Sequence, residues 1–181
     1  MRIVQHRRWP MIMKLTHCSQ LFAMALFAVA SVSSRADTVE SKSRDASATF
    51  VETQHFIVGR IGRDCLTEIG RSETPLAFQQ KWQRDNAPYF DAARKYLAAR
   101  LREIENPEAR DAVERAYFAS AERTGEAATA QLFSKGSKDE VCKHAMTLVD
   151  TGSMDIEQFA KATNLPIFAD VEALAKWGST R

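Results

Sequence analysis

The sequence predicts an all-α protein: a single helical bundle with four main helical regions and two short C-terminal helices over residues 49–181. Apolar residues recur every three or four positions, which is the spacing of one face of an α-helix. Helix-start signals separate these stretches: a capping residue followed by proline, or by an acidic residue three positions later. No stretch shows the alternation of apolar and polar residues that is typical of a half-buried strand.

The first helical region is expected to begin at Thr49, because Thr49 and Glu52 have the spacing of a capping box. Residues 37–48 precede it and are polar apart from a single valine and a few alanines. Such a stretch buries too little apolar surface to fold, so it predicts a flexible lead-in. The inward stripe of the first region contains Val58, Ile61, Cys65 and Ile69.

The second helical region begins at Thr74-Pro75, since threonine is a good cap and proline suits the first turn of a helix. Pro88 lacks a backbone donor and crowds the preceding turn, so it predicts a kink or a fresh helix start. Residues 89–104 beyond it are strongly amphipathic. Their inward positions are Phe90, Ala93, Leu97, Leu101 and Ile104.

The third and fourth regions carry the same kinds of start signal. Asn106-Pro107 begins the third, and the capping box of Ser137 and Glu140 begins the fourth. In the fourth region Cys142 lies near the apolar stripe. Two short helical pieces, at about residues 154–163 and 166–177, complete the bundle.

The N-terminal residues 1–36 have the three parts of an export signal in their usual order. Positively charged residues are followed by the apolar run from Leu21 to Ala30 and then by small residues. Ser34 and Ala36 suit a signal peptidase, so we expect cleavage after Ala36; an earlier cut near Ala30 is the alternative. A membrane anchor is not favoured, because the apolar run has ten residues and a bilayer requires about 20.

Removal of this leader would change the charge of the protein. It contains five of the 25 basic residues and none of the 23 acidic ones, so the formal charge falls from +2 to −3. No run of lysine and arginine with interleaved aromatic residues remains, and a nucleic-acid partner is not expected. The start codon could correspond to Met1, Met11 or Met13, and the mature chain would be the same.

Cys65 and Cys142 are the only cysteines after residue 36, since Cys18 belongs to the leader. An even number of cysteines in an exported protein predicts a disulfide. Closing a loop of roughly 77 residues would stabilise the fold by up to about 4.5 kcal/mol in the chain-entropy description. The alternatives are two buried free thiols, or one reactive thiol beside a histidine.

Metal binding is the first type of chemistry to consider, because Glu52 and His55 have a Glu-x-x-His spacing that places both on one helical face. A di-iron site in a helix bundle requires a second such pair, and Glu140 and His144 are four positions apart instead. A zinc site from the two cysteines and two histidines is disfavoured, because Cys142 and His144 would point about 200° apart. We therefore expect no metal and no cofactor.

The segment over residues 81–90 is the candidate binding region. It combines aromatic, charged and amide side chains around a helix break, a mixture that is typical of binding hot spots and pockets. The alternative is that Trp82 and Phe90 belong to the core and that Asn86 caps the next helix. The candidate binding residues are Trp82, Arg84, Asn86, Tyr89 and Phe90.

Function is constrained mainly by what the chain lacks, since it has no nucleophile elbow, phosphate-binding glycine loop, His-Glu-x-x-His or haem-attachment motif. In size and layout it resembles small exported helical bacterial proteins with one disulfide, among them inhibitor and immunity proteins that block secreted enzymes. This resemblance of class implies no particular functional residues. The sequence favours a periplasmic or secreted, non-enzymatic module that binds a protein or a cell-envelope component. The alternative is a small-ligand-binding bundle, or a small periplasmic enzyme without a recognised motif.

Overall fold

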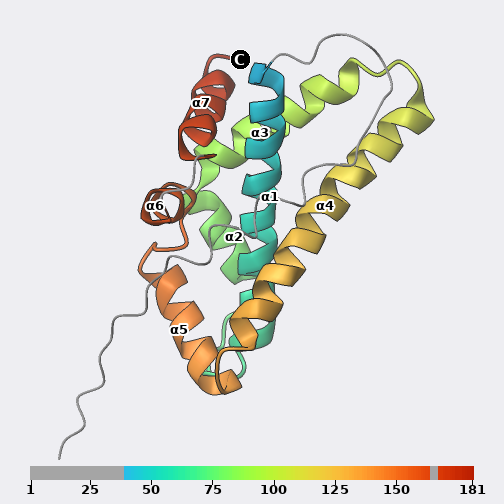
Figure 1. The fold of residues 1–181 in the computed structure, drawn as a ribbon. Helices are drawn as coiled ribbons and strands as arrows, with labels where there is room; N and C mark the ends of the chain where they lie inside the picture. The colour runs from blue at the N-terminus through green and yellow to red at the C-terminus, as the bar shows by residue number, and fades with distance from the viewer. Residues whose placement is uncertain (1–38, 164–166) are drawn as a thin grey trace, which may run out of the picture. The chain divides into compact units, whose positions relative to one another are not determined.

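The computed structural model of the protein describes residues 39–163 and 167–181, and every regular element within them is an α-helix (Figure 1). The all-α prediction is confirmed. The described residues belong to one compact unit, residues 37–181. The helices are α1 (Val39–Cys65), α2 (Pro75–Asp85), α3 (Ala87–Arg102), α4 (Pro107–Phe133), α5 (Lys138–Asp150), α6 (Ile156–Ala162) and α7 (Ile167–Ser179).

Helix α1 is the centre of the bundle and packs against α2, α3, α4, α5 and α7 (Figure 1). Its inward stripe of apolar residues at three- and four-residue steps is completely or almost completely buried. Removing this stripe from water is the main favourable contribution to packing. The stripe consists of Val51, Val58, Ile61 and Cys65.

The start of α1 differs from the sequence expectation. The helix begins at Val39, ten residues before Thr49, so residues 39–48 are its first turns and their prediction as a flexible lead-in is wrong. Residues 37 and 38 of the predicted lead-in lie outside the described residues. Thr49 is inside the helix, where its hydroxyl donates to the Asp45 carbonyl at 2.9 Å instead of capping a helix start.

Neighbouring helices explain why this polar segment is helical. The Tyr96 hydroxyl of α3 donates to Asp45 Oδ1 at 2.8 Å, and the Tyr117 hydroxyl of α4 donates to the Ala48 carbonyl at 2.7 Å. Ser47 and Ala48 are fully buried, because small side chains allow other helices to approach closely. Tertiary contacts therefore override the weak apolar content of the segment.

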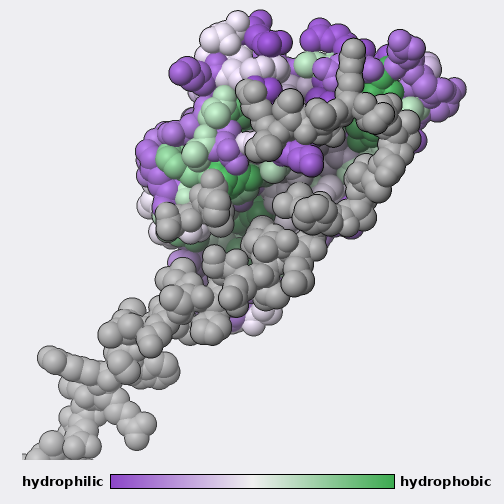
Figure 2. All heavy atoms as spheres, turned by 45° about the horizontal axis from the view of Figure 1, so that its top comes forward, coloured by the Kyte–Doolittle hydropathy of each residue, from purple (hydrophilic) through white to green (hydrophobic). Residues whose placement is uncertain are grey.

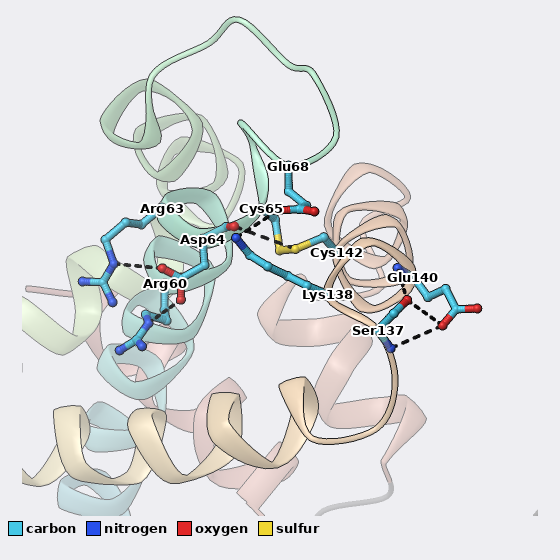
Figure 3. Close-up of a disulfide and its surroundings, with 9 residues drawn as sticks. All are labelled: Arg60, Arg63, Asp64, Cys65, Glu68, Ser137, Lys138, Glu140 and Cys142. Atoms are coloured by element: carbon cyan, nitrogen blue, oxygen red, sulfur yellow. Dashed lines mark hydrogen bonds and ion pairs between the residues drawn. A yellow bond between two sulfur atoms is a disulfide. The ribbon is translucent and has the colours of Figure 1, made fainter.

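The predicted helix starts at Thr74, Asn106 and Ser137 are confirmed. The Thr74 hydroxyl accepts a hydrogen bond from a backbone amide in the first turn of α2, and the side-chain oxygen Oδ1 of Asn106 accepts one from a backbone amide in the first turn of α4. Ser137 and Glu140 form the full capping box of α5, as Figure 3 shows. Each cap stabilises its helix by about 1 kcal/mol.

The predicted disulfide is confirmed as well, because the Sγ atoms of Cys65 and Cys142 are 2.06 Å apart. The bridge joins the last residue of α1 to α5, and both cysteines are fully buried (Figure 3). Beside it, Lys138 forms an ion pair with Glu68, with 2.9 Å between Nζ and Oε2. The bridge is consistent with an oxidising compartment.

Helix α4 has two unlike halves. Its C-terminal half packs on α1, where the lack of a side chain at Gly125 leaves room for the Phe56 ring. In its N-terminal half, residues 107–116 are all exposed, and this part runs beyond α1 to the corner with α3 (Figure 1). No helix in the described ranges is long and apolar enough to cross a membrane.

Candidate functional site

The five residues of the candidate binding segment do not form one exposed patch. Trp82 and Phe90 are in the hydrophobic core, with exposed fractions of 3% and 2%, and their rings meet edge to face at 5.6 Å. Asn86 is also buried, Tyr89 is half-buried and Arg84 is exposed. Most of the aromatic surface of the segment is therefore buried in the hydrophobic core and cannot contact a partner.

Asn86 has a role that differs from the expected cap of the next helix. Its side chain makes no capping hydrogen bond to α3. Instead, Oδ1 accepts from the Ile156 amide at 2.8 Å, and Nδ2 donates to the Trp82 carbonyl at 2.9 Å and to Asp155 at 3.1 Å. Asn86 thus stands at the predicted N-cap position of α3, but its side chain joins the break between α2 and α3 to the start of α6 instead of capping α3.

A pocket of about 220 Å³ lies where α1, α3 and α4 come together, and Phe90 forms part of its wall. We call it the α1–α3–α4 pocket. Its walls are mostly apolar, with four ionisable side chains among them. The lining residues are Glu52, His55, Phe90, Ala93, Arg94, Leu97, Tyr117 and Phe118.

Helical spacing explains how the α3 wall forms. Phe90, Arg94 and Leu97 follow one another at three- and four-residue steps, so they lie on one face of the helix. Ala93 is small and buried, and leaves space between this face and α1. On the α4 side Phe118 is 43% exposed, which is unusual for a large apolar ring. On the face shown in Figure 2, hydrophobic side chains reach the surface in patches with hydrophilic side chains around them.

The Glu52 carboxylate and the His55 ring are in contact, with 3.3 Å between Oε1 and Nδ1. Their predicted position on one helical face is confirmed. The His55 ring also packs edge to face on Phe90 at 5.1 Å. Burial raises the pKa of Tyr117, and the Glu52 carboxylate adds to this effect. The Tyr117 hydroxyl therefore stays protonated and is occupied by its bond to Ala48.

Glu52 and His55 give this pocket one pair of hydrogen-bonding side chains. When Nδ1 of His55 holds the proton that faces Glu52, Nε2 is free to accept a hydrogen bond. Within the described residues the lining contains no serine, threonine, cysteine or lysine that could act as a nucleophile. Across the same residues, no three His, Cys, Asp or Glu side chains gather to hold a metal ion.

A second pocket, of about 260 Å³, lies between α2 and α3 and also has Phe90 in its wall. We call it the α2–α3 pocket. Of the candidate binding residues, Arg84 and Phe90 line it, whereas Trp82, Asn86 and Tyr89 line neither pocket. The structure thus brings two of the five residues to one cavity. The full lining is Gln80, Gln83, Arg84, Ala87, Phe90 and Asp91.

Sequence reasoning missed Arg94 and Phe118 as candidate site residues. Phe118 carries no local signal of exposure, because it lies three positions before Ala121 and seven before Gly125, and helical spacing therefore places it on the buried face of α4. Arg94 carries no signal either, since an arginine on an amphipathic helix is most often only solvated. The pocket forms from segments about 60 residues apart in the chain, which no local pattern reveals.

No protein-family model matches the chain, and no curated protein or solved structure matches it. The roles of the pocket residues therefore rest on their geometry alone.

Proposed function

We propose that the protein is an exported, non-enzymatic binding module whose α1–α3–α4 pocket receives an apolar side chain of a partner protein. The observation that carries this proposal is the 43% exposed ring of Phe118 beside an apolar pocket. Aromatic residues around a pocket that accepts an anchoring side chain are a recurrent feature of protein interfaces.

The size of the pocket favours a side chain over a free ligand. Sites for small molecules typically enclose about 300–1,000 Å³. The α1–α3–α4 pocket has about 220 Å³ and the α2–α3 pocket about 260 Å³. Each is below that range and is large enough for one leucine or phenylalanine side chain. A small-ligand carrier is therefore the less favoured function.

The polar groups around the apolar centre also suit a protein partner. Arg94 is exposed, and Glu52 and His55 are half-buried at the α1 wall. An apolar centre with a polar rim is the usual anatomy of a protein interface. The rim would fix the register of the partner, and the apolar centre would contribute most of the binding free energy.

Export to the periplasm or the outside of the cell is part of the same proposal. The signal sequence over residues 1–36 and its cut after Ala36 lie outside the described residues. A buried Cys65–Cys142 bridge supports export, because disulfides persist in oxidising compartments.

Capture of envelope proteins tests the proposed function. Purified native protein and its Phe118→Ala variant are compared as baits, with Leu76→Ala as the matched control. Leu76 is 62% exposed on α2 and lines neither pocket. We expect Phe118→Ala to weaken capture by at least fivefold while Leu76→Ala captures like the native protein. Equal capture by all three proteins, with unchanged circular dichroism, would contradict the proposal.

A further inference from the structure

One face of α3 runs through both pockets. Ala87 and Asp91 line the α2–α3 pocket, Arg94 and Leu97 line the α1–α3–α4 pocket, and Phe90 lines both. These residues follow at three- and four-residue steps, so they form one continuous stripe. At 1.5 Å per residue, the stripe from Ala87 to Leu97 is about 15 Å long.

The α2–α3 pocket differs from its neighbour because four of its six lining residues have polar side chains. Gln80 is exposed and Gln83 is half-buried, and the side-chain amide of neither one hydrogen-bonds to another residue in the described part of the chain. Each amide offers two donors and a carbonyl acceptor. The two glutamines therefore present the groups that would pair with a peptide backbone.

We infer that the two pockets are subsites of one groove, which binds an extended, uncharged peptide segment of a partner. An apolar side chain of the segment enters the α1–α3–α4 pocket, and its backbone hydrogen-bonds to Gln80 and Gln83 in the α2–α3 pocket. This inference rests on the proposed function and specifies the conformation and the chemistry of the bound segment.

An extended segment fits this groove better than a helix. A helix satisfies its backbone N–H and C=O groups internally, so it would leave the side-chain amides of Gln80 and Gln83 without partners. An extended chain leaves N–H and C=O groups free along its length. At about 3.3 Å per residue, four to five residues cover the 15 Å stripe, and every second side chain points toward the groove.

The charges of the groove favour an uncharged segment. The α2–α3 pocket is lined by the positive Arg84 and the negative Asp91. The α1–α3–α4 pocket is lined by the positive Arg94 and the negative Glu52. An acidic or basic residue would gain from one of these groups and be repelled by the other. A neutral segment avoids this repulsion.

Binding of a defined peptide tests the inference. The probe is the N-acetylated, C-amidated pentapeptide Ser-Phe-Gly-Ser-Gly, titrated into ¹⁵N-labelled protein and followed by amide chemical shifts. We expect shifts at Leu97 and Phe118 and also in the side-chain amides of Gln80 and Gln83. Replacing the phenylalanine of the probe by alanine, or two of its residues by glutamate, should weaken binding at least fivefold.

A double variant, Gln80→Ala with Gln83→Ala, separates this inference from the proposed function. We expect it to bind the pentapeptide about five- to tenfold more weakly, because two hydrogen bonds are lost. Leu76→Ala, on the same helix, should bind like the native protein.

The outcomes distinguish the two proposals. If the double variant binds the pentapeptide as tightly as the native protein, or if the probe shifts only Leu97 and Phe118, the two-subsite groove is wrong and the proposed function is unaffected. If no probe binds while Phe118→Ala still loses envelope partners, the extended, uncharged segment is wrong. If Phe118→Ala also captures normally, both proposals fail.

Discussion

The side-chain oxygen of Asn86 accepts a hydrogen bond from the backbone amide of Ile156 at 2.8 Å, so a residue between α2 and α3 caps the start of α6. Asp155 occupies the usual capping position of α6 but makes no capping hydrogen bond with its side chain. The link spans 70 residues of sequence and holds α6 against the break from which the α3 wall of both pockets begins.

Replacement of Asn86 by alanine is expected to destabilise the fold by about 1–3 kcal/mol. The change leaves the buried Ile156 amide and the Trp82 carbonyl without their side-chain partner. Urea unfolding of the two proteins measures the difference. The exposed neighbour Arg84, replaced by alanine, serves as a control that should change stability by less than about 0.5 kcal/mol. Equal midpoints for Asn86→Ala and the native protein would show that the link is not stabilising.

Removal of the disulfide is expected to lower the free energy of unfolding by about 2–5 kcal/mol. The variant to test is Cys65→Ala combined with Cys142→Ala, compared with the native protein in the presence and absence of reductant. Thiol labelling without reductant should modify neither cysteine of the native protein, and labelling after reduction and unfolding should modify both. Two labelled thiols before reduction would contradict the bridge.

Substitution of Gly178 by alanine is expected to destabilise the contact between α3 and α7. A Cβ at this position would lie 2.6 Å from the Ala92 Cα, so backbone must move to admit it. Overpacking of this kind costs about 1–3 kcal/mol, and the gain of about 1 kcal/mol in helix propensity offsets only part of this cost when backbone must move. Gly136→Ala is the control, because its Cβ would meet only side-chain atoms at 3.5 Å or more. A thermal midpoint of Gly178→Ala at or above the native value would argue against the close approach.

The free energy of unfolding is expected to fall as the pH rises above 10, because the Tyr96 hydroxyl then loses its proton. Burial raises the pKa of Tyr96, and the Asp45 carboxylate adds to this effect. Since the folded state holds the phenolic proton more tightly than the unfolded chain, the stabilisation is complete below the ordinary tyrosine pKa of about 10 and is lost as the pH rises beyond it. At neutral pH Tyr96→Phe should be less stable by about 1 kcal/mol, because the bond to Asp45 is lost.

The alkaline range provides the matching test. The stability difference between native protein and Tyr96→Phe should shrink between pH 10 and pH 11, since phenylalanine does not ionise. Denaturant unfolding at a series of pH values measures it. A difference that is constant over this range would mean that the Tyr96 hydroxyl is not held in its protonated form by the fold.

The helix starts at Thr74, Asn106 and Ser137 could be predicted because each depends on side chains within one turn. The disulfide could be predicted because exclusion of the leader leaves only Cys65 and Cys142. Such features need no knowledge of distant contacts.

The features that were mispredicted or missed depend on contacts between distant segments. Residues 39–48 look too polar to fold, and only Tyr96 and Tyr117 of other helices reveal why they are helical. Asn86 stands at the N-cap of α3, but the backbone amide that its side chain binds belongs to Ile156 in α6. In the same way, the α1–α3–α4 pocket exists only once three helices meet.

Site-specific photo-crosslinking from position 118 shows whether a partner protein sits over the α1–α3–α4 pocket. A benzophenone amino acid replaces Phe118 in cells that make the protein, and a second strain carries it at Leu76, which is also exposed but lines neither pocket. We expect a discrete adduct with one envelope or secreted protein from position 118 and none from position 76. No adduct from position 118, or the same adducts from both positions, would contradict the proposed function.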